Sequence, residues 1–580
     1  METENGIGKN ASSGFRSFVG MVARRQPPKS PLPINLDEFN PAPTIMPTPT
    51  AIAERSNSAD RRSHVIAAII GCIIMASGLP QGTCRSRAAE PQQQPDTRFR
   101  ETTTIDWDAI EPPPPPTGSP NVLLIVADDL GGRVGWEGHR SVKTPNLDAL
   151  AARGRWYRHA YCQQSVCNPS RASMLTGRSL DRLGIADLET HFRRRDPGIV
   201  TLPQSFKRAG YHVHGIGKIF HNFKQDAFRG DPASWTAASI LHYGSHGWDT
   251  PRVDGAIPPD ELDPPVPRAT RRDVPDDAYL DGRVATAAVD RLKQLARRDR
   301  PFFLAVGMWK PHTPFNAPSK YWAMYDDVDI APPDPPEPPL GVPPIALHDN
   351  WEMMRAFKNG IDARQTRLLR QGYYAAITYM DAQVGRVLDE LDRSDLRDDT
   401  IVVFTSDHGY HLGEHALWCK TSNFELDARV PLIVSGPGIE PSPSPTDDMV
   451  ELVDLFPTLC AAANVSPPEG LDGVVMPSVV ASATEPRRYA LTQHPRPAYW
   501  HFENGFTEMG YSIRDDRFRY TRWHRIDDGT VIAREMYDHR DDPLETVNVV
   551  DRDDLASART RLDAELSRRT SLRAFRTSDD

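Results

Sequence analysis

Short runs of apolar residues, each ending in ionisable side chains, recur through the middle of the chain. Residues 121–129 read NVLLIVADD, and residues 399–409 read DTIVVFTSDHG. The same pattern returns at residues 211–221 (YHVHGIGKIFH) and 301–312 (PFFLAVGMWKPH). A continuous apolar run of this length is typical of a strand that is covered on both faces, so we predict four buried strands.

Amphipathic segments lie between these runs and predict helices. Apolar periodicity indicates helices at about residues 278–297 and 370–391, and the segment 144–154 carries Thr144 as an N-cap and Gly154 as a terminator. Alternating strands and helices favour an α/β fold, with a mostly parallel sheet sandwiched by helices. Ligands of such sheets bind beyond the carboxyl ends of the strands, where the ionisable residues gather here.

The pattern changes near residue 445. VELVDLFPTLCAAANV (450–465) predicts a helix, and ASARTRLDAELSRR (556–569) predicts another close to the end of the chain. Between them, an antiparallel meander is predicted from three segments, at residues 489–494, 509–525 and 535–543. We therefore expect a large α/β domain over residues 118–444 and a smaller α+β domain with an antiparallel sheet over residues 445–580.

Residues 1–117 differ from the rest and predict a largely disordered leader. Arg61 and Arg62 precede an apolar run from Val65 to Gly78, which is shorter than the ~20 residues of a membrane helix but suits a signal peptide. EPPPPPTGSP (111–120) predicts a stiff extended linker. We expect an exported protein, periplasmic or extracellular; an anchor that stays in the membrane, or a buried helix, is the alternative for the apolar run.

Composition narrows the class of protein. The chain has 68 basic and 78 acidic residues among 580, a net charge of −10, which argues against a general nucleic-acid binder. Six cysteines are too few for a disulfide scaffold in a chain of this length. Packing must therefore stabilise the fold, and the individual cysteines need their own explanation.

The ionisable residues at the strand ends form two chemical sets. Carboxylates suit a hard divalent cation, which an imidazole completes or borders, and the candidates are Asp128, Asp129, Asp407 and His408. Cations and proton donors suit an oxyanion whose charge grows as an ester bond breaks, and the candidates are Lys218, His221, His312 and Lys420. Each residue alone is more often a cap or a surface charge, but their recurrence at strand ends favours a site.

Cys167 begins the segment CNPSRASMLTGR (167–178). If Asn168 and Pro169 open a helix, Arg171 falls one turn later on the same face, and the helix N-terminus favours negative charge at residue 167. A thiolate nucleophile would need an adjacent base, and a hard-cation site is a poor setting for soft sulfur. A buried, inert thiol is the other alternative.

The segment beginning at Cys167 resembles the signature of the sulfatases. The resemblance extends from NVLLIVADDL (121–130) to EMYDHRDDP (535–543). It is strongest with the iduronate-2-sulfatase-like branch, through GIGKIFH, MWKPHTPF, SDHGYHLGEHALWCKTSNFE and EMGYSIRDDRFRYTRW. Several motifs in the same order make the match specific.

This resemblance implies an alkaline-phosphatase-like fold and a particular chemistry. A separate maturation enzyme would oxidise Cys167 to formylglycine, whose hydrate supplies the nucleophile. One calcium ion would be held by Asp128, Asp129, residue 167, Asp407 and His408. Arg171 and Lys218 would steady the diol, and the sulfate oxygens would be bound by Lys218, His221, His312 and Lys420. Either His312 or Lys420 would protonate the leaving alcohol.

The resemblance thus predicts a sulfuric ester hydrolase, with residues 118–444 as its catalytic domain and a sulfated glycan or oligosaccharide as substrate. A phosphodiesterase or phosphonate monoester hydrolase of the same superfamily is one alternative, and an exported glycan-binding protein with an inactive site is another. Tyr410 and Gly215 replace a tryptophan and a serine of the iduronate branch, so the sugar stays open. His411 and Glu414 either contact a sugar or have capping and turn roles, and the proline-rich segment 331–344 either walls the pocket or is a spacer.

Overall fold

The structure of the chain is a computed structural model. It describes residues 113–222, 225, 228–242, 250–483, 486–499 and 505–575. Most of the predicted leader, including the apolar run from Val65 to Gly78, lies outside the described residues. Within the described residues, no helix is both long and apolar enough to cross a membrane.

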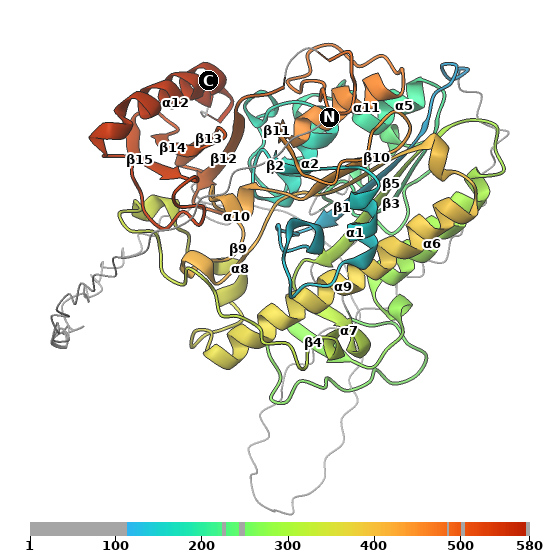
Figure 1. The fold of residues 1–580 in the computed structure, drawn as a ribbon, viewed down its shortest axis with the longest axis horizontal. Coiled ribbons are helices and arrows are strands. Elements are labelled where there is room, and N and C mark those ends of the chain that lie inside the picture. Colours follow the sequence, from blue (N-terminus) through green and yellow to red (C-terminus); the bar gives the residue numbers. More distant parts are fainter. Residues whose placement is uncertain are drawn as a thin grey trace, which may run out of the picture. The chain divides into compact units, whose positions relative to one another are not determined.

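A seven-stranded sheet forms the centre of the fold (Figure 1). Its strands in order are β11 (Thr446–Glu451), β2 (Arg155–Tyr161), β10 (Leu432–Ser435), β7 (Thr400–Ser406), β1 (Asn121–Asp128), β5 (Phe302–Pro311) and β3 (His212–Gly217). Every neighbouring pair is parallel except the two that involve β10. The predicted mostly parallel sheet is therefore confirmed, and all four predicted strands belong to it.

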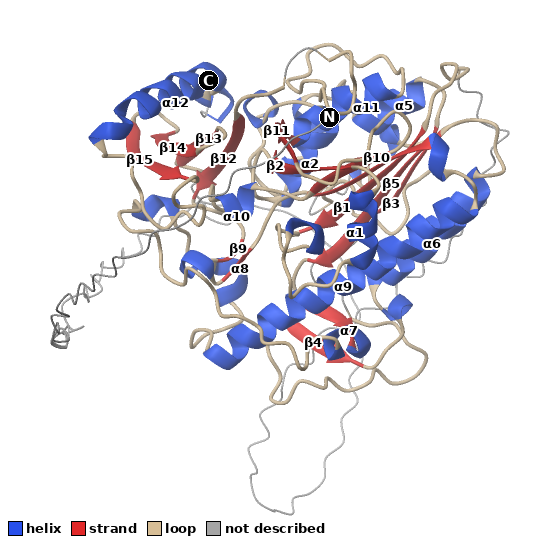
Figure 2. Ribbon diagram, in the orientation of Figure 1, coloured by secondary structure: helices blue, strands red, loops and turns tan. Residues whose placement is uncertain are grey.

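Helices cover both faces of this sheet. Side chains of a strand alternate between its two faces, so a strand that is apolar throughout needs a helical layer on each side. In β1, Leu123 and Ile125 pack with one helical layer, whereas Val122 and Leu124 pack with the other. Figure 2 shows the two layers. The first contains α1 (Pro145–Ala152), α6 (Leu280–Leu295) and α9 (Ala363–Arg393), and the second contains α2 (Cys167–Thr176), α5 (Leu202–Arg208) and α11 (Leu455–Ala462).

Two predicted helices differ from the observed ones. α9 starts earlier than predicted because Asp362 forms a capping box with Gln365, whose backbone N–H donates to the Asp362 carboxylate at 2.7 Å. The prediction of one helix over residues 450–465 was wrong at its start. Val450 and Glu451 belong to β11, which pairs with β2, and α11 begins only at Leu455.

A separate antiparallel sheet lies in the C-terminal part, as predicted. Its strands in order are β12 (Ala490–Arg496), β13 (Glu508–Arg514), β14 (Phe518–Arg525) and β15 (Val531–Asp538). The predicted closing helix is α12 (Ala556–Arg569), which buries Leu562 and Leu566 against this sheet. Since β11 lies beyond residue 445 yet pairs in the large sheet, the domain boundary at residues 444 and 445 stays a prediction.

Shorter elements complete the described fold. The strands are β4 (Ala269–Arg272) with β6 (Phe315–Pro318), and β8 (His411–Leu412) with β9 (Trp418–Cys419). The short helices are α3 (Leu180–Leu183), α4 (Phe192–Arg195), α7 (Ser319–Ala323), α8 (Trp351–Met354) and α10 (Glu425–Ala428).

The order of the strands brings the predicted chemistry together. β7, β1, β5 and β3 are adjacent and parallel, so their carboxyl ends share one edge of the sheet. Asp407, Asp128, His312 and Lys218 stand at or just after these ends. Asp128 and Asp407, which are 279 positions apart in the sequence, therefore meet at this edge.

Candidate active site

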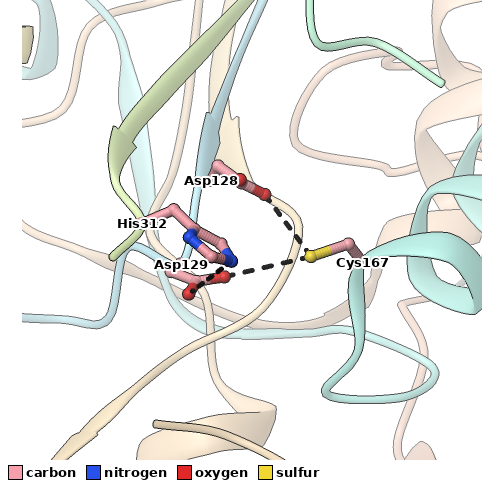
Figure 3. Close-up of side chains that lie close together, drawn as sticks. All are labelled: Asp128, Asp129, Cys167 and His312. Carbon is pink, nitrogen blue, oxygen red and sulfur yellow. Dashed lines mark hydrogen bonds and ion pairs between the residues drawn. The ribbon is translucent and has the colours of Figure 1, made fainter. Parts of the chain in front are cut away.

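Buried ionisable side chains at this edge form a cluster around Cys167, which has only 1% of its surface exposed. Its sulfur is 3.6 Å from Oδ1 of Asp128 and 4.0 Å from Oδ1 of Asp129 (Figure 3). Nε2 of His408 is 3.4 Å away, and Nζ of Lys420 is 3.9 Å away. Two acidic residues, an imidazole and an ammonium group thus surround one sulfur atom.

The helix α2 holds Cys167 in this position. The helix begins at Cys167 after the extended Val166 and ends at Thr176, before Gly177, whose φ of 64° glycine adopts readily. All its residues are buried, and the Ser170 hydroxyl donates to the backbone oxygen of Asp407 at 2.5 Å. Residue 167 is therefore fixed at a helix N-terminus, where backbone N–H groups favour negative charge.

Arg171 lies beneath the cluster and binds its carboxylates. Nε donates to Oδ2 of Asp407 at 2.8 Å, and Nη2 donates to Oδ1 of Asp128 at 3.2 Å. The guanidinium is completely buried. It joins two acidic residues that come from different strands, and its predicted part in steadying a diol stays a prediction.

Lys218 neutralises Asp128. Its Nζ lies 2.7 and 2.6 Å from the two carboxylate oxygens and 5.3 Å from the centre of the Trp309 ring. Burial alone would raise the pKa of Asp128, but Lys218, with smaller contributions from His312 and Arg171, holds that pKa well below its ordinary value. Asp128 is consequently a carboxylate at neutral pH.

Lys420 and His312 face Asp129. Nζ of Lys420 is 2.9 Å from both carboxylate oxygens, and Nε2 of His312 is 3.6 Å from Oδ2. The two nitrogens are 3.0 Å apart. Asp129 has a φ of 65°, a left-handed conformation that is uncommon outside glycine and that turns this carboxylate into the site.

The donor set fits a hard divalent cation. Three buried carboxylates crowd the site, and burial raises the pKa of Asp129 well above its ordinary value, with Asp128 adding to the shift and Lys420 opposing it. Burial also lowers the pKa of His408, which keeps its imidazole neutral, and Nδ1 faces the Gly409 oxygen at 3.0 Å so that Nε2 faces the cluster. A cation among these groups would stabilise the ionised acids.

The unmodified thiol is a poor nucleophile here. Burial, reinforced by Asp128, raises the pKa of the Cys167 thiol well above its ordinary value. The side chain is therefore a neutral thiol near pH 7, which disfavours the thiolate alternative.

Three other singled-out residues are buried near the site. His411 lies with Nδ1 2.6 Å from Oδ1 of Asp427, and Glu414 is ion-paired with Arg370 and Arg133, so both side chains have partners within the protein and their contact with a sugar stays a prediction. His221 is buried just beyond β3, and its contact with sulfate stays a prediction.

The two departures from the iduronate branch also have packing consequences. Tyr410 is completely buried and stacks on Tyr373, with ring centres 5.3 Å apart. A Cβ atom at Gly215 would lie 2.7 Å from the Trp235 ring. A serine at residue 215 therefore has no room in the present arrangement of Trp235.

Two residues of the site were missed by the sequence analysis. Glu352, on α8, lies 3.6 Å from both His312 and Lys420, and the Tyr499 hydroxyl donates to it at 2.7 Å. Neither residue follows a buried strand of the large sheet, and neither carries a recognisable motif. The proline-rich segment that precedes Glu352 was the only nearby signal.

Family models and curated relatives match most of the chain. Residues 120–465, more than half of the chain, match the family model described as Sulfatase, and residues 413–571 match that of N-sulphoglucosamine sulphohydrolase, C-terminal. Iduronate 2-sulfatase of Mus musculus is 33% identical over 510 residues, covering 75% of this chain and 91% of that protein.

Solved structures share the fold at low sequence identity. One, determined in complex with its substrate D-glucosamine-2-N,6-O-disulfate, matches with a TM-score of 0.61 at 20% identity and covers 78% of this chain and 97% of that one. The phosphonate monoester hydrolase of Silicibacter pomeroyi matches with a TM-score of 0.63 at 22% identity, covering 77% and 94%.

Proposed function

The chain belongs to the sulfatase family, with its alkaline-phosphatase-like fold, and from this premise we propose a specific reaction. The protein removes sulfate from a sulfated carbohydrate by means of a formylglycine made from Cys167 and one bound calcium ion. The observation that carries the proposal is the position of Cys167, buried at a helix N-terminus among Asp128, Asp129, His408 and Lys420. A structural cysteine has no need of such neighbours.

Formylglycine accounts for this position of the side chain. Its hydrate supplies one hydroxyl that attacks sulfur and a second that allows the sulfate to be released, which a thiol cannot do. The residue would be generated by a separate maturation enzyme, which is the protein partner we propose. The helix N-terminus at residue 167 favours the negative charge that develops on these oxygens.

We propose calcium as the cation, because the donor set suits a hard divalent cation and the resemblance to the sulfatases implies calcium. The residues that would hold it are Asp128, Asp129, Asp407, His408 and residue 167. A divalent cation held there would acidify a hydroxyl and would offset the charge of the sulfate oxygens. Arg171 keeps Asp128 and Asp407 in place through its two hydrogen bonds.

The remaining cations suit the sulfate group and the leaving alcohol. Lys218 lies over Asp128, and Lys420 and His312 lie over Asp129, so all three reach the same space around residue 167. We assign them, with His221, to the sulfate oxygens, where fixed positive charge stabilises the transition state. His312 or Lys420 then gives a proton to the leaving oxygen.

Mass spectrometry of the peptide that contains residue 167 tests the proposal. Protein produced together with a formylglycine-generating enzyme should carry the aldehyde and release sulfate from aryl or sugar esters. Cys167→Ala should keep its melting temperature and lose turnover by at least about a thousandfold, because the nucleophile is gone. An unmodified thiol in active protein would refute the mechanism. An unmodified thiol in inactive protein would favour the glycan-binding alternative.

The phosphonate monoester hydrolases that share the fold define the second candidate function. Turnover of 4-nitrophenyl sulfate and of 4-nitrophenyl phenylphosphonate by the same preparation separates the two functions. We expect a higher kcat/KM for the sulfate, because its family relatives are named sulfatases. The reverse order would assign the protein to the phosphonate class.

We also propose that the chain is exported and that residues 118–444 form its catalytic domain. The apolar run after Arg61 and Arg62 supports export, and the position of every predicted site residue between 128 and 420 supports the division. Fractionation of expressing cells tests the first point. Recovery of the protein only in the cytoplasm would contradict it.

A further inference from the structure

We propose that Glu352 is a positioning residue of the reaction, which holds Lys420 and His312 where they protonate the leaving alcohol. The inference rests on the proposed sulfatase function. It assigns a role to a residue that no motif marked.

The carboxylate of Glu352 faces both proton donors. Oε1 is 3.6 Å from Nε2 of His312, and Oε2 is 3.6 Å from Nζ of Lys420. The Tyr499 hydroxyl donates to Oε2 at 2.7 Å and so fixes the orientation of the carboxylate. Only 8% of Glu352 is exposed, which strengthens its electrostatic effect relative to a surface carboxylate.

The side chain of Asn350 links the start of α8, which carries Glu352, to the segment that carries Lys420. Asn350, just before α8, has a φ of 55° and accepts a hydrogen bond from the backbone N–H of Trp418 at 2.7 Å. Its side-chain amide also donates to the Ala416 oxygen at 3.0 Å. We call these two hydrogen bonds the tether. Glu352 is two residues from Asn350 at one end of the tether, and Lys420 is two residues from Trp418 at the other.

The proton donors form a pair between two carboxylates. Lys420 lies between Asp129 and Glu352, and its Nζ is 3.0 Å from Nε2 of His312. Nδ1 of His312 is 2.6 Å from the backbone oxygen of Thr313. We assign this contact as a hydrogen bond donated by Nδ1–H, so that Nε2 faces Lys420. Asp129 is also a predicted cation ligand, whereas Glu352 contacts the pair without a predicted part in holding the cation.

The step that this arrangement assists is the breaking of the ester bond. As the bond from sulfur to the leaving oxygen breaks, its electron pair stays on that oxygen, which takes one proton from the Lys420–His312 pair. Glu352 keeps the pair in place for this transfer. Its contribution therefore depends on how much the leaving group needs a proton.

Two aryl sulfates separate this role from a structural one. The 4-nitrophenolate ion leaves readily without a proton, whereas the phenolate ion of phenyl sulfate needs one. Glu352→Gln should lower kcat/KM for phenyl sulfate by about tenfold or more and that for 4-nitrophenyl sulfate by less than about threefold. Tyr499→Phe should also lower kcat/KM more for phenyl sulfate than for 4-nitrophenyl sulfate, but by smaller factors than Glu352→Gln. It provides a second variant if Glu352→Gln fails to fold.

The exposed Glu261, which pairs with Arg271, offers a matched control. Glu261→Gln should leave both rates unchanged. Equal losses on the two substrates in folded Glu352→Gln and Tyr499→Phe would overturn the inference while leaving the sulfatase assignment intact. A wild-type protein that carries formylglycine but releases sulfate from neither ester would instead overturn the proposed function.

Discussion

At the scale of single residues, the site depends on how buried charges are paired. Asp128 lies between Lys218 and Arg171, and Asp129 lies beside Lys420. These groups are excluded from water, so removing one member leaves its partner as an uncompensated buried charge, which typically costs about 3–5 kcal/mol. Substitutions that keep shape and hydrogen bonds are therefore better probes of function than truncations.

Asp407→Asn applies this rule to a predicted calcium ligand. The amide keeps the size of the side chain but removes a negative charge, so the affinity for the cation should fall at least tenfold and turnover should fall with it. Elemental analysis of protein dialysed against low calcium measures the first effect, and sulfate release measures the second. Asp392→Asn, at an exposed ion pair with Arg397, is the control. Full calcium content in Asp407→Asn would exclude residue 407 as a ligand.

The residues that could be predicted from the sequence are those attached to a strand end. Asp128 and Asp407 follow apolar runs directly, and parallel pairing of β1 with β7 then brings them to one edge. Glu352 and Tyr499 could not be predicted in this way, because Glu352 lies on the four-residue helix α8 and Tyr499 in a loop, and distant contacts set the path of both segments. The packing of Gly215 against Trp235 was hidden for the same reason.

At the scale of elements, length decided what the sequence pattern could predict. The buried strands β1, β5 and β7 and the long helices α6 and α9 have enough residues to display a clear period. β10 has four residues and runs against its neighbours, and nothing in its local pattern indicates that direction. The helix α8 is equally short, and its importance comes only from the position in which it holds Glu352.

The anchoring of α8 can be tested at Asn350. Asn350→Ala removes two hydrogen bonds and places alanine at a left-handed φ, so we expect a loss of about 1–3 kcal/mol in stability. Turnover of phenyl sulfate should also fall, because Glu352 loses its fixed distance from Lys420. Asn350→Gly, which accepts this φ without strain, separates the two causes. If denaturant unfolding and turnover of Asn350→Ala both match the wild type, the tether has no role.

At the scale of the whole molecule, the antiparallel sheet is part of the site's support. Arg519 on β14 is buried between Glu425 on α10 and Glu545, with Nε 2.9 Å from the Glu545 carboxylate. An apolar cluster forms the same junction, with Trp523 and Tyr537 of the antiparallel sheet packed against a core that includes Phe424, Leu417 and Ala346. Because Phe424 lies four residues beyond Lys420, loosening this junction should affect both stability and the site.

Glu535 makes the stability of this junction depend on pH. Its carboxyl accepts hydrogen bonds from Trp523 at 3.0 Å and Tyr537 at 2.8 Å, and burial raises its pKa from 4.5 to about 7, although these hydrogen bonds oppose the shift. Between these pH values the folded state retains a proton that the unfolded state has released, so stability falls as pH rises through this window.

Glu535→Gln removes this titration while keeping the shape of the side chain: the amide oxygen can still accept from Trp523, and the amide NH2 can donate to the Tyr537 hydroxyl in place of the bond that the carboxyl accepts. The free energy of unfolding of the wild type, relative to that of the variant, should therefore fall by about 2–3 kcal/mol between pH 4.5 and pH 8. Urea unfolding at several pH values measures the difference, and the exposed Glu261→Gln should follow the wild type throughout. If the curves of wild type and Glu535→Gln stay parallel, Glu535 is ionised in the folded protein, and the junction must stabilise the charge through neighbours such as Arg496, which favours the ionised form.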